Sequence, residues 1–189
     1  MTNMYNKEEA GRSMVEMLGV LAIVGVLSIG GISGYSKAMA KYKVNKTLDQ
    51  ISMLVTNVRS TFGNQNSYEG LNEASLIAYN LVDKDMSLGS TSKLYNPYNG
   101  SVEVTTTNDA RAFVISYANI PTDACANIAS SNWGDSAASG LVSLEVGTST
   151  HNWASTDADK GLPIKFGEAA KECNSNASAG YITLKWTYY

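Results

Sequence analysis

An apolar run of nineteen residues near the N-terminus limits how this chain folds. The run extends from Met14 to Ile32 and contains one charged residue, Glu16. As a helix it is long enough to cross the hydrocarbon core of a bilayer, which is about 30 Å thick. An ionised carboxylate in such a run is costly in lipid, so Glu16 either has a partner or lies near the interface, where the headgroups solvate it. The run therefore predicts a membrane span with a separate role for one acidic side chain.

The helical pattern continues well beyond the apolar run. Apolar residues recur at helical spacing as far as Phe62, and the first proline is Pro97. Gly63 and Asn64 are typical of a helix C-terminus. The sequence predicts one helix from Arg12 to Phe62, about 75 Å long. Its first half is apolar all round, and its second half is amphipathic and needs a globular partner.

Glycines are concentrated where the two halves of this helix meet. Gly30, Gly31 and Gly34 lie at or just after the end of the apolar run. Each glycine inside a helix costs about 0.5–1 kcal/mol relative to alanine. The three glycines predict a flexible point in the helix, and close helix–helix packing through small residues is a compatible alternative.

The rest of the chain predicts one globular domain. The 127 residues from 63 to 189 are enough for a domain with its own core. Helical patterns occur at residues 67–88 and, with Pro121 in the first turn, at residues 120–129. Residues 147–161 predict a polar loop. Alternating or buried patterns predict strands at Ser101–Thr107, Phe113–Tyr117, Leu141–Val146 and Tyr181–Tyr189.

The charge and the two cysteines narrow the classes of function. The net charge of −3, with no basic face, gives no reason to expect nucleic-acid binding. Cys125 and Cys173, with one distant histidine, do not make a zinc site. They are either free core residues or one disulfide, and a membrane or secretory signal favours the disulfide. That disulfide would close a loop of about 49 residues, worth about 4 kcal/mol by chain entropy.

The sequence offers little catalytic chemistry. His151 lies in the predicted polar loop without a nucleophile motif, so we expect a solvated side chain. The segment Asp157-Ala-Asp-Lys-Gly161 matches only the start of a calcium loop. We expect no metal, no cofactor and no enzymatic activity. The three tryptophans are expected to pack in the core or in loops: Trp133, Trp153 and Trp186.

Two sets of residues resemble a known family. Gly11, then Arg12-Ser-Met-Val-Glu16 and the apolar run, resembles the prepilin signature: a short charged leader ending in glycine, and glutamate as fifth residue after the cut. The C-terminal half contains Ile120-Pro-Thr-Asp-Ala-Cys125, Ser131-Asn-Trp-Gly-Asp135, Cys173 and a final strand. This order resembles the type IVb pilins of thin conjugative and adherence pili.

The resemblance implies an α+β, pilin-like fold. A long N-terminal helix would pack on an antiparallel β-sheet, with its apolar half protruding or spanning a membrane. Residues 1–11 would be a leader, residues 12–35 the membrane and filament-core half of the helix, and residues 36–189 the globular domain with the amphipathic half. Cys125 and Cys173 would join as a disulfide in the C-terminal region.

The resemblance also implies a structural function. The chain would be a type IV pilus subunit in a surface filament for adhesion, aggregation, motility or conjugation. A prepilin peptidase would cut between Gly11 and Arg12 and methylate the new N-terminus. Glu16 would pair with the amino group of Arg12 on a neighbouring subunit. Identical subunits, the peptidase and an inner-membrane assembly platform are the implied partners, first in the inner membrane and then in the extracellular pilus.

Two alternatives stay open at this point. One is a minor pilin or a type II secretion pseudopilin, which shares the fold but not the abundance. The other is a membrane-anchored extracytoplasmic binding domain that never polymerises, for which Glu16 would be dispensable.

The distribution of lysines conflicts with the implied orientation. Lys7 and Arg12 precede the apolar run, whereas four lysines follow it: Lys37, Lys41, Lys43 and Lys46. The positive-inside rule alone would place the C-terminal domain in the cytoplasm. We expect it outside, because the family has it there and a two-cysteine domain suits an oxidising compartment.

Overall fold

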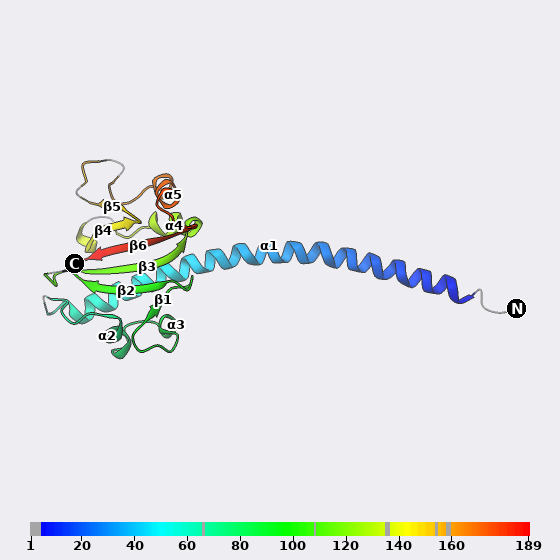
Figure 1. Ribbon diagram of the computed structural model, residues 1–189, viewed down its shortest axis with the longest axis horizontal. Helices are drawn as coiled ribbons and strands as arrows, with labels where there is room; N and C mark the ends of the chain where they lie inside the picture. The colour runs from blue at the N-terminus through cyan, green and yellow to red at the C-terminus, as the bar shows by residue number, and fades with distance from the viewer. Residues whose placement is uncertain (1–4, 66, 108, 135–136, 154, 158–159) are drawn as a thin grey trace. The chain divides into compact units, whose positions relative to one another are not determined.

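The computed structural model describes residues 5–65, 67–107, 109–134, 137–153, 155–157 and 160–189, with side chains from Met14 onward (Figure 1). The chain divides into two compact units, residues 1–42 and 43–189. Helix α1 (Tyr5–Phe62) begins in the first unit and ends in the second. The predicted divisions after residues 11 and 35 concern processing and the membrane, and they stay predictions.

Helix α1 ends where the sequence predicts but begins earlier than expected. Its start at Tyr5 lies inside the predicted leader, where Glu8, Glu9 and Ala10 are good helix formers. At the other end, the backbone N–H of Gly63 donates to the carbonyl of Arg59 at 2.8 Å. A Cβ on Gly63 would lie 2.5 Å from that carbonyl oxygen, so the chain leaves the helix at a position that only glycine fits.

One antiparallel sheet is the frame of the second unit. Within the described ranges its strands are in the order β1-β2-β3-β6-β4-β5 (Figure 1). They are β1 (Leu94–Tyr95), β2 (Ser101–Thr106), β3 (Phe113–Pro121), β4 (Leu141–Val146), β5 (Ser149–Asn152) and β6 (Tyr181–Tyr188). The four predicted strands are confirmed as β2, β3, β4 and β6. The prediction of a loop over residues 147–161 is wrong where β5 pairs with β4.

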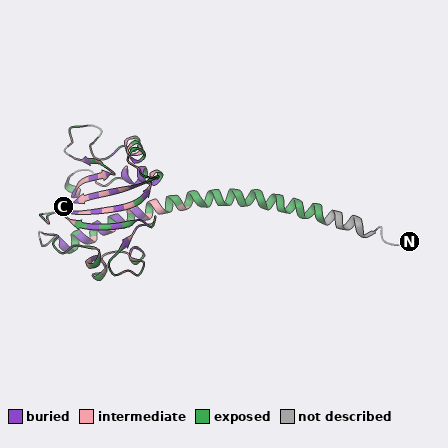
Figure 2. Cartoon of the chain, viewed as in Figure 1, coloured by how far each residue is buried: buried purple, intermediate pink, exposed green. Residues whose placement is uncertain are grey.

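The core lies between α1 and one face of this sheet. Buried and non-buried residues alternate along β2 and β6, as expected for strands with one covered face. Ile51, Leu54 and Val58 supply the buried side of α1 (Figure 2). Fully buried side chains of the two central strands belong to the same hydrophobic cluster, among them Phe113, Ile115 and Tyr117 of β3, and Trp186 of β6.

The shorter helices differ from the sequence-based expectation. The single helix predicted over residues 67–88 is wrong, because two short helices occur there, α2 (Glu73–Ala78) and α3 (Lys84–Ser87). Asn72 caps α2 through a hydrogen bond to the N–H of Ser75, and Asn80 has a φ of 59°, which ends the helical path. Helix α4 (Thr122–Ala129) is close to the predicted range, with Pro121 as its N-cap.

Helix α5 (Phe166–Ser175) and the 3-10 turn η1 (Ala137–Ser139) are not predicted by the sequence analysis. Helix α5 packs against α4 (Figure 1). The sequence pattern that indicates α5 is a helical spacing of apolar residues, at Phe166, Ala169, Ala170 and Cys173. Because two of these side chains are alanines, the pattern is weak.

We expect an alkaline loss of stability from buried tyrosines. Burial raises the pKa of Tyr188, which is 4% exposed, to about 12. The unfolded chain releases this proton near pH 10 and the folded chain near pH 12, so stability is retained below pH 10 and lost as the pH rises to 12. In the Tyr188→Phe variant, the free energy of unfolding measured between pH 9 and 12 should fall by about 2–3 kcal/mol less than in the unaltered chain. Tyr79→Phe, at a position 70% exposed, is the control, and an unchanged pH dependence in Tyr188→Phe would contradict the assignment.

Candidate functional site

The first unit presents an apolar helical surface. Every large apolar side chain between Met14 and Ile32 is exposed, with exposed fractions from 51% to 73% (Figure 2). In the part of the chain that the structure describes, α1 is the one helix whose length and composition suit a membrane crossing. Burying such a surface is strongly favourable, so it is a surface for lipid or for other protein chains.

Glu16 is the acidic residue on this surface. Its side chain is exposed and makes no ion pair with any described residue of its own chain. Gly11 and Arg12 lie in the helical backbone of α1, but the Arg12 side chain lies outside the described residues. The roles of these three residues therefore stay predictions.

The three glycines of the predicted flexible point lie within a continuous helix. A Cβ added at Gly30, Gly31 or Gly34 would meet no atom within 4 Å. Close packing inside the subunit therefore does not require glycine at these positions. A bend, or a close approach of another helix, stays a prediction.

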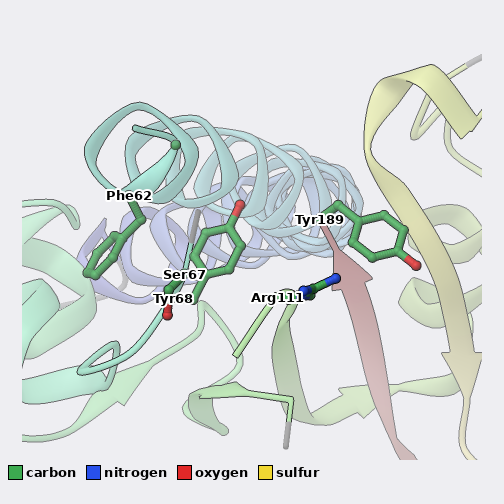
Figure 3. Close-up of a pocket in the computed structure, with 6 residues that line it drawn as sticks. Phe62, Ser67, Tyr68, Arg111 and Tyr189 are labelled. Carbon is green, nitrogen blue, oxygen red and sulfur yellow. The ribbon is translucent and has the colours of Figure 1, made fainter. Parts of the chain in front are cut away.

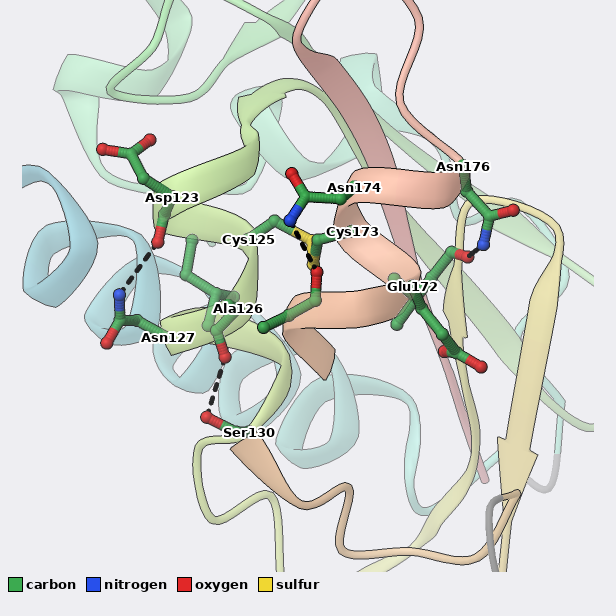
Figure 4. Close-up of a disulfide and its surroundings, with 12 residues drawn as sticks. Asp123, Cys125, Ala126, Asn127, Ser130, Glu172, Cys173, Asn174 and Asn176 are labelled. Carbon is green, nitrogen blue, oxygen red and sulfur yellow. Dashed lines mark hydrogen bonds between the residues drawn. A yellow bond between two sulfur atoms is a disulfide. The ribbon is translucent and has the colours of Figure 1, made fainter. Parts of the chain in front are cut away.

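The structure brings Cys125 and Cys173 together as a disulfide (Figure 4). Cys125 lies on α4 and Cys173 on α5, their Cα atoms are 6.0 Å apart, and both side chains are fully buried. The expected disulfide is confirmed, and the alternative of free cysteines is wrong. Residues next to the bridge bond within their own helices, with the side chains of Asn127 and Asn174 donating to the carbonyls four residues earlier (Figure 4).

His151 is not the solvated loop residue that the sequence predicts. It lies on β5 opposite Leu144, which is itself opposite Trp186 on β6, so the register carries it onto the buried face. Its Nε2 atom is 2.6 Å from a carboxylate oxygen of Glu172 on α5. This polar contact ties β5 to the helix that carries Cys173. A four-residue polar strand has no hydrophobic alternation, so the sequence gives no signal for this burial.

Asn176 fixes the end of α5 against the β4–β5 hairpin. Its amide nitrogen donates to the carbonyl of Val146 at 3.0 Å and to the hydroxyl of Ser149 at 3.1 Å. Its amide oxygen accepts from the Thr148 hydroxyl at 3.0 Å. The disulfide, the His151 contact and Asn176 thus hold α5 to α4 and to the outer part of the sheet. Neither Glu172 nor Asn176 is singled out by the sequence.

The tryptophans pack as predicted. Trp186 is fully buried, and its ring centroid is 5.1 Å from that of Trp133. The indole nitrogen of Trp133 donates to the carbonyl of Ile128, and that of Trp153 donates to the carbonyl of Leu141. These contacts secure the loop before β4 and the start of the segment after β5.

A hollow in the second unit lies beyond the end of α1 (Figure 3). Its volume is about 460 Å³, and Phe62, Gly63, Ser67, Tyr68, Arg111 and Tyr189 line it. Arg111 is the one charged side chain among these residues. No cluster of three metal-ligating side chains occurs among the described residues, although Asp159 of the partial calcium loop lies outside them.

A long N-terminal helix on an antiparallel sheet, with a disulfide-bound C-terminal region, defines a type IV pilin. The crystal structure of a type IV b pilin from Salmonella typhi has this fold, with a TM-score of 0.50, 22% identity, and coverage of 76% of this chain and 98% of that chain. The model of the Bundlin family matches residues 36–189. The chain belongs to the Bundlin family.

Two curated relatives match over nearly the whole chain. Both are described as the major structural subunit of bundle-forming pilus. The protein of Escherichia coli O111:H- is 25% identical over 184 residues, covering 95% of each chain. The protein of Escherichia coli O127:H6 (strain E2348/69 / EPEC) is 24% identical over the same length and share.

Proposed function

We propose that this chain is the structural subunit of a type IV pilus and that identical copies polymerise into an extracellular filament. The observation that carries the proposal is the exposed apolar surface of α1 with one carboxylate, Glu16. Such a surface is stable in a membrane or against copies of itself, and not in water. Contacts of one face of a subunit with a different face of the next, repeated without closing, produce a helical fibre.

The precursor is processed at its N-terminal segment. A prepilin peptidase cuts between Gly11 and Arg12 and methylates the amino group of Arg12. The cut removes the first eleven residues, including Glu8 and Glu9, and leaves a cationic N-terminus four residues from Glu16. In a filament this amino group pairs with Glu16 of a neighbouring subunit, which offsets the cost of a carboxylate in an apolar core.

Assembly of the filament starts with subunits in the inner membrane. The apolar half of α1 holds the processed subunit there until the assembly platform transfers it to the growing fibre. Gly30, Gly31 and Gly34 lie near the end of the apolar run, and each makes the helix easier to deform by about 0.5–1 kcal/mol relative to alanine. Deformation at these glycines lets neighbouring helices approach as they pack in the filament.

Intact-mass and N-terminal analysis of sheared surface filaments tests this function. We expect this chain to dominate the sheared material, to begin at Arg12 with one added methyl group, and to lack two hydrogens because of the disulfide. A chain that starts at Met1 and stays in the membrane fraction would contradict the proposal and favour a membrane-anchored binding domain. A processed chain present only in traces would identify a minor pilin instead.

A further inference from the structure

A ring of tyrosines and lysines follows the apolar run on α1. Tyr35, Lys37, Lys41 and Tyr42 lie in the first compact unit and are all exposed, with exposed fractions of 67% for Tyr35 and 59% for Tyr42. Neither Lys37 nor Lys41 makes a hydrogen bond or ion pair with any residue that the structure describes. Two cations therefore lie at the edge of the candidate membrane span without a partner in their own chain.

The next two lysines of the helix are used differently. Lys46 pairs with Asp83 at 3.1 Å and with Asp85 at 3.5 Å, and the hydrogen bond that its ammonium donates to the Asp83 carboxylate is the main reason that the pKa of Lys46 is raised. The Nζ atom of Lys43 lies 5.5 Å from the centre of the Tyr98 ring. Both contacts belong to the second unit. The four lysines that oppose the positive-inside rule thus divide into two with intramolecular partners and two without.

The tyrosines and lysines of this ring lie on two opposite sides of the helix. Successive residues on an α-helix are about 100° apart, so Tyr35 and Tyr42 share one side while Lys37 and Lys41 share nearly the opposite side. From Met17 to Leu48 the helix contains no aspartate or glutamate. One protein partner would cover one side of such a ring. A lipid surface meets all sides at once, and interfacial tyrosines are typical of membrane-spanning helices.

The axial position of the ring fits the lipid headgroups. Residues 14–32 span about 28 Å as a helix, which matches the hydrocarbon core, and Lys37 and Lys41 follow about 8 Å and about 14 Å beyond Ile32. Because side chains on a helix lean back toward its N-terminus, the long lysine stems bring both ammonium groups toward the phosphates. We propose that Lys37 and Lys41 bind anionic phospholipid headgroups on the C-terminal side of the membrane span. This inference rests on the proposed function, because it requires α1 to span a membrane before assembly.

Spin-labelled lipids measure this preference directly. The full-length chain is reconstituted into phosphatidylcholine bilayers that contain spin-labelled phosphatidylglycerol or spin-labelled phosphatidylcholine, and the motionally restricted fraction is recorded. One lysine at an anionic surface contributes enough for about a fivefold preference for phosphatidylglycerol. We expect that preference in the unaltered chain at low salt and a decline in 0.5 M NaCl, because salt screens the contact.

Matched variants separate this contact from general charge. The pair Lys37→Gln and Lys41→Gln should bind both lipids equally, whereas Lys37→Arg with Lys41→Arg should keep the preference. The control pair, Lys165→Gln with Lys171→Gln, removes the same charge from exposed positions of the second unit and should behave as the unaltered chain does.

Three results would overturn the inference in distinguishable ways. If the unaltered chain restricts the two lipids equally, it has no preference for the anionic lipid, although α1 still spans the bilayer. A preference that persists in the glutamine pair would exclude these two lysines as its source. Absence of any restricted lipid would show that α1 does not enter the bilayer, and the proposed function would then fail with it.

Discussion

Replacing Glu16 with alanine is expected to abolish the filament while the subunit remains folded. The carboxylate makes no ion pair with any described residue of its own chain, so we expect its loss to leave the fold unaffected. Removing one partner of a desolvated charge pair costs about 2–5 kcal/mol at an interface, or at least about thirtyfold in the concentration needed for growth. Every subunit of a fibre repeats that loss. Pili counted by electron microscopy and pilin recovered by shearing should both fall to background.

The variant also separates assembly from membrane anchoring. An alanine in the apolar run enters lipid more readily than a carboxylate, so the membrane fraction should hold at least as much subunit as before. Glu69→Ala is the matched control, because it removes an exposed carboxylate from the second unit. Normal filaments built from Glu16→Ala subunits would contradict the proposed pairing. The accumulated subunit should have the mass of a chain that begins at Arg12, which would show that the leader is still removed.

Loss of the disulfide is expected to produce the largest change in the stability of the second unit. Cys125 and Cys173 are 48 positions apart, and the chain-entropy relation for a loop of that size gives about 4 kcal/mol. The double variant Cys125→Ala with Cys173→Ala should lower the free energy of unfolding by that order. Chemical unfolding of the full-length chain in mild detergent, followed by fluorescence of buried Trp186 and its neighbour Trp133, measures the change.

Reduction of the unaltered chain is the control for this variant. If the bridge acts by restricting the unfolded chain, the reduced chain and the double variant should unfold at the same denaturant concentration. Each single variant should unfold at that same concentration, because a free thiol in a fully buried position behaves as a small apolar group. Equal midpoints for the oxidised chain and the double variant would contradict a stabilising role for the bridge.

The long helix and four strands were predictable because their residues follow simple rules. Apolar residues at helical spacing lead to Phe62, and the helix ends at Gly63, where a Cβ would lie 2.5 Å from the carbonyl oxygen of Arg59. Alternation along β2 and β6 reflects one covered face. The single helix predicted over residues 67–88 failed because local capping by Asn72 and the turn at Asn80 outweigh hydrophobic spacing.

Other parts were not predictable from local patterns. The burial of His151 follows from its register with Leu144 and Trp186, which is a property of the assembled sheet. The candidate assembly residues Gly11, Arg12 and Glu16 were identified by resemblance to prepilins. Physical reasoning from one chain shows that a carboxylate in an apolar run is costly. It does not identify the partner of Glu16, because the proposed partner lies on another subunit. A single chain contains half of that interaction.

The bridge between α4 and α5 has a consequence for survival outside the cell. Strands β4 and β5 and the segment that leads into α5 all lie between Cys125 and Cys173. A protease that cuts one peptide bond in this interval leaves both fragments joined through sulfur. Strand β6, on the C-terminal fragment, then stays paired with β3, on the N-terminal fragment, and with β4. We expect a subunit that is cut once on an exposed loop to stay in the proposed filament, so that one cleavage does not sever it.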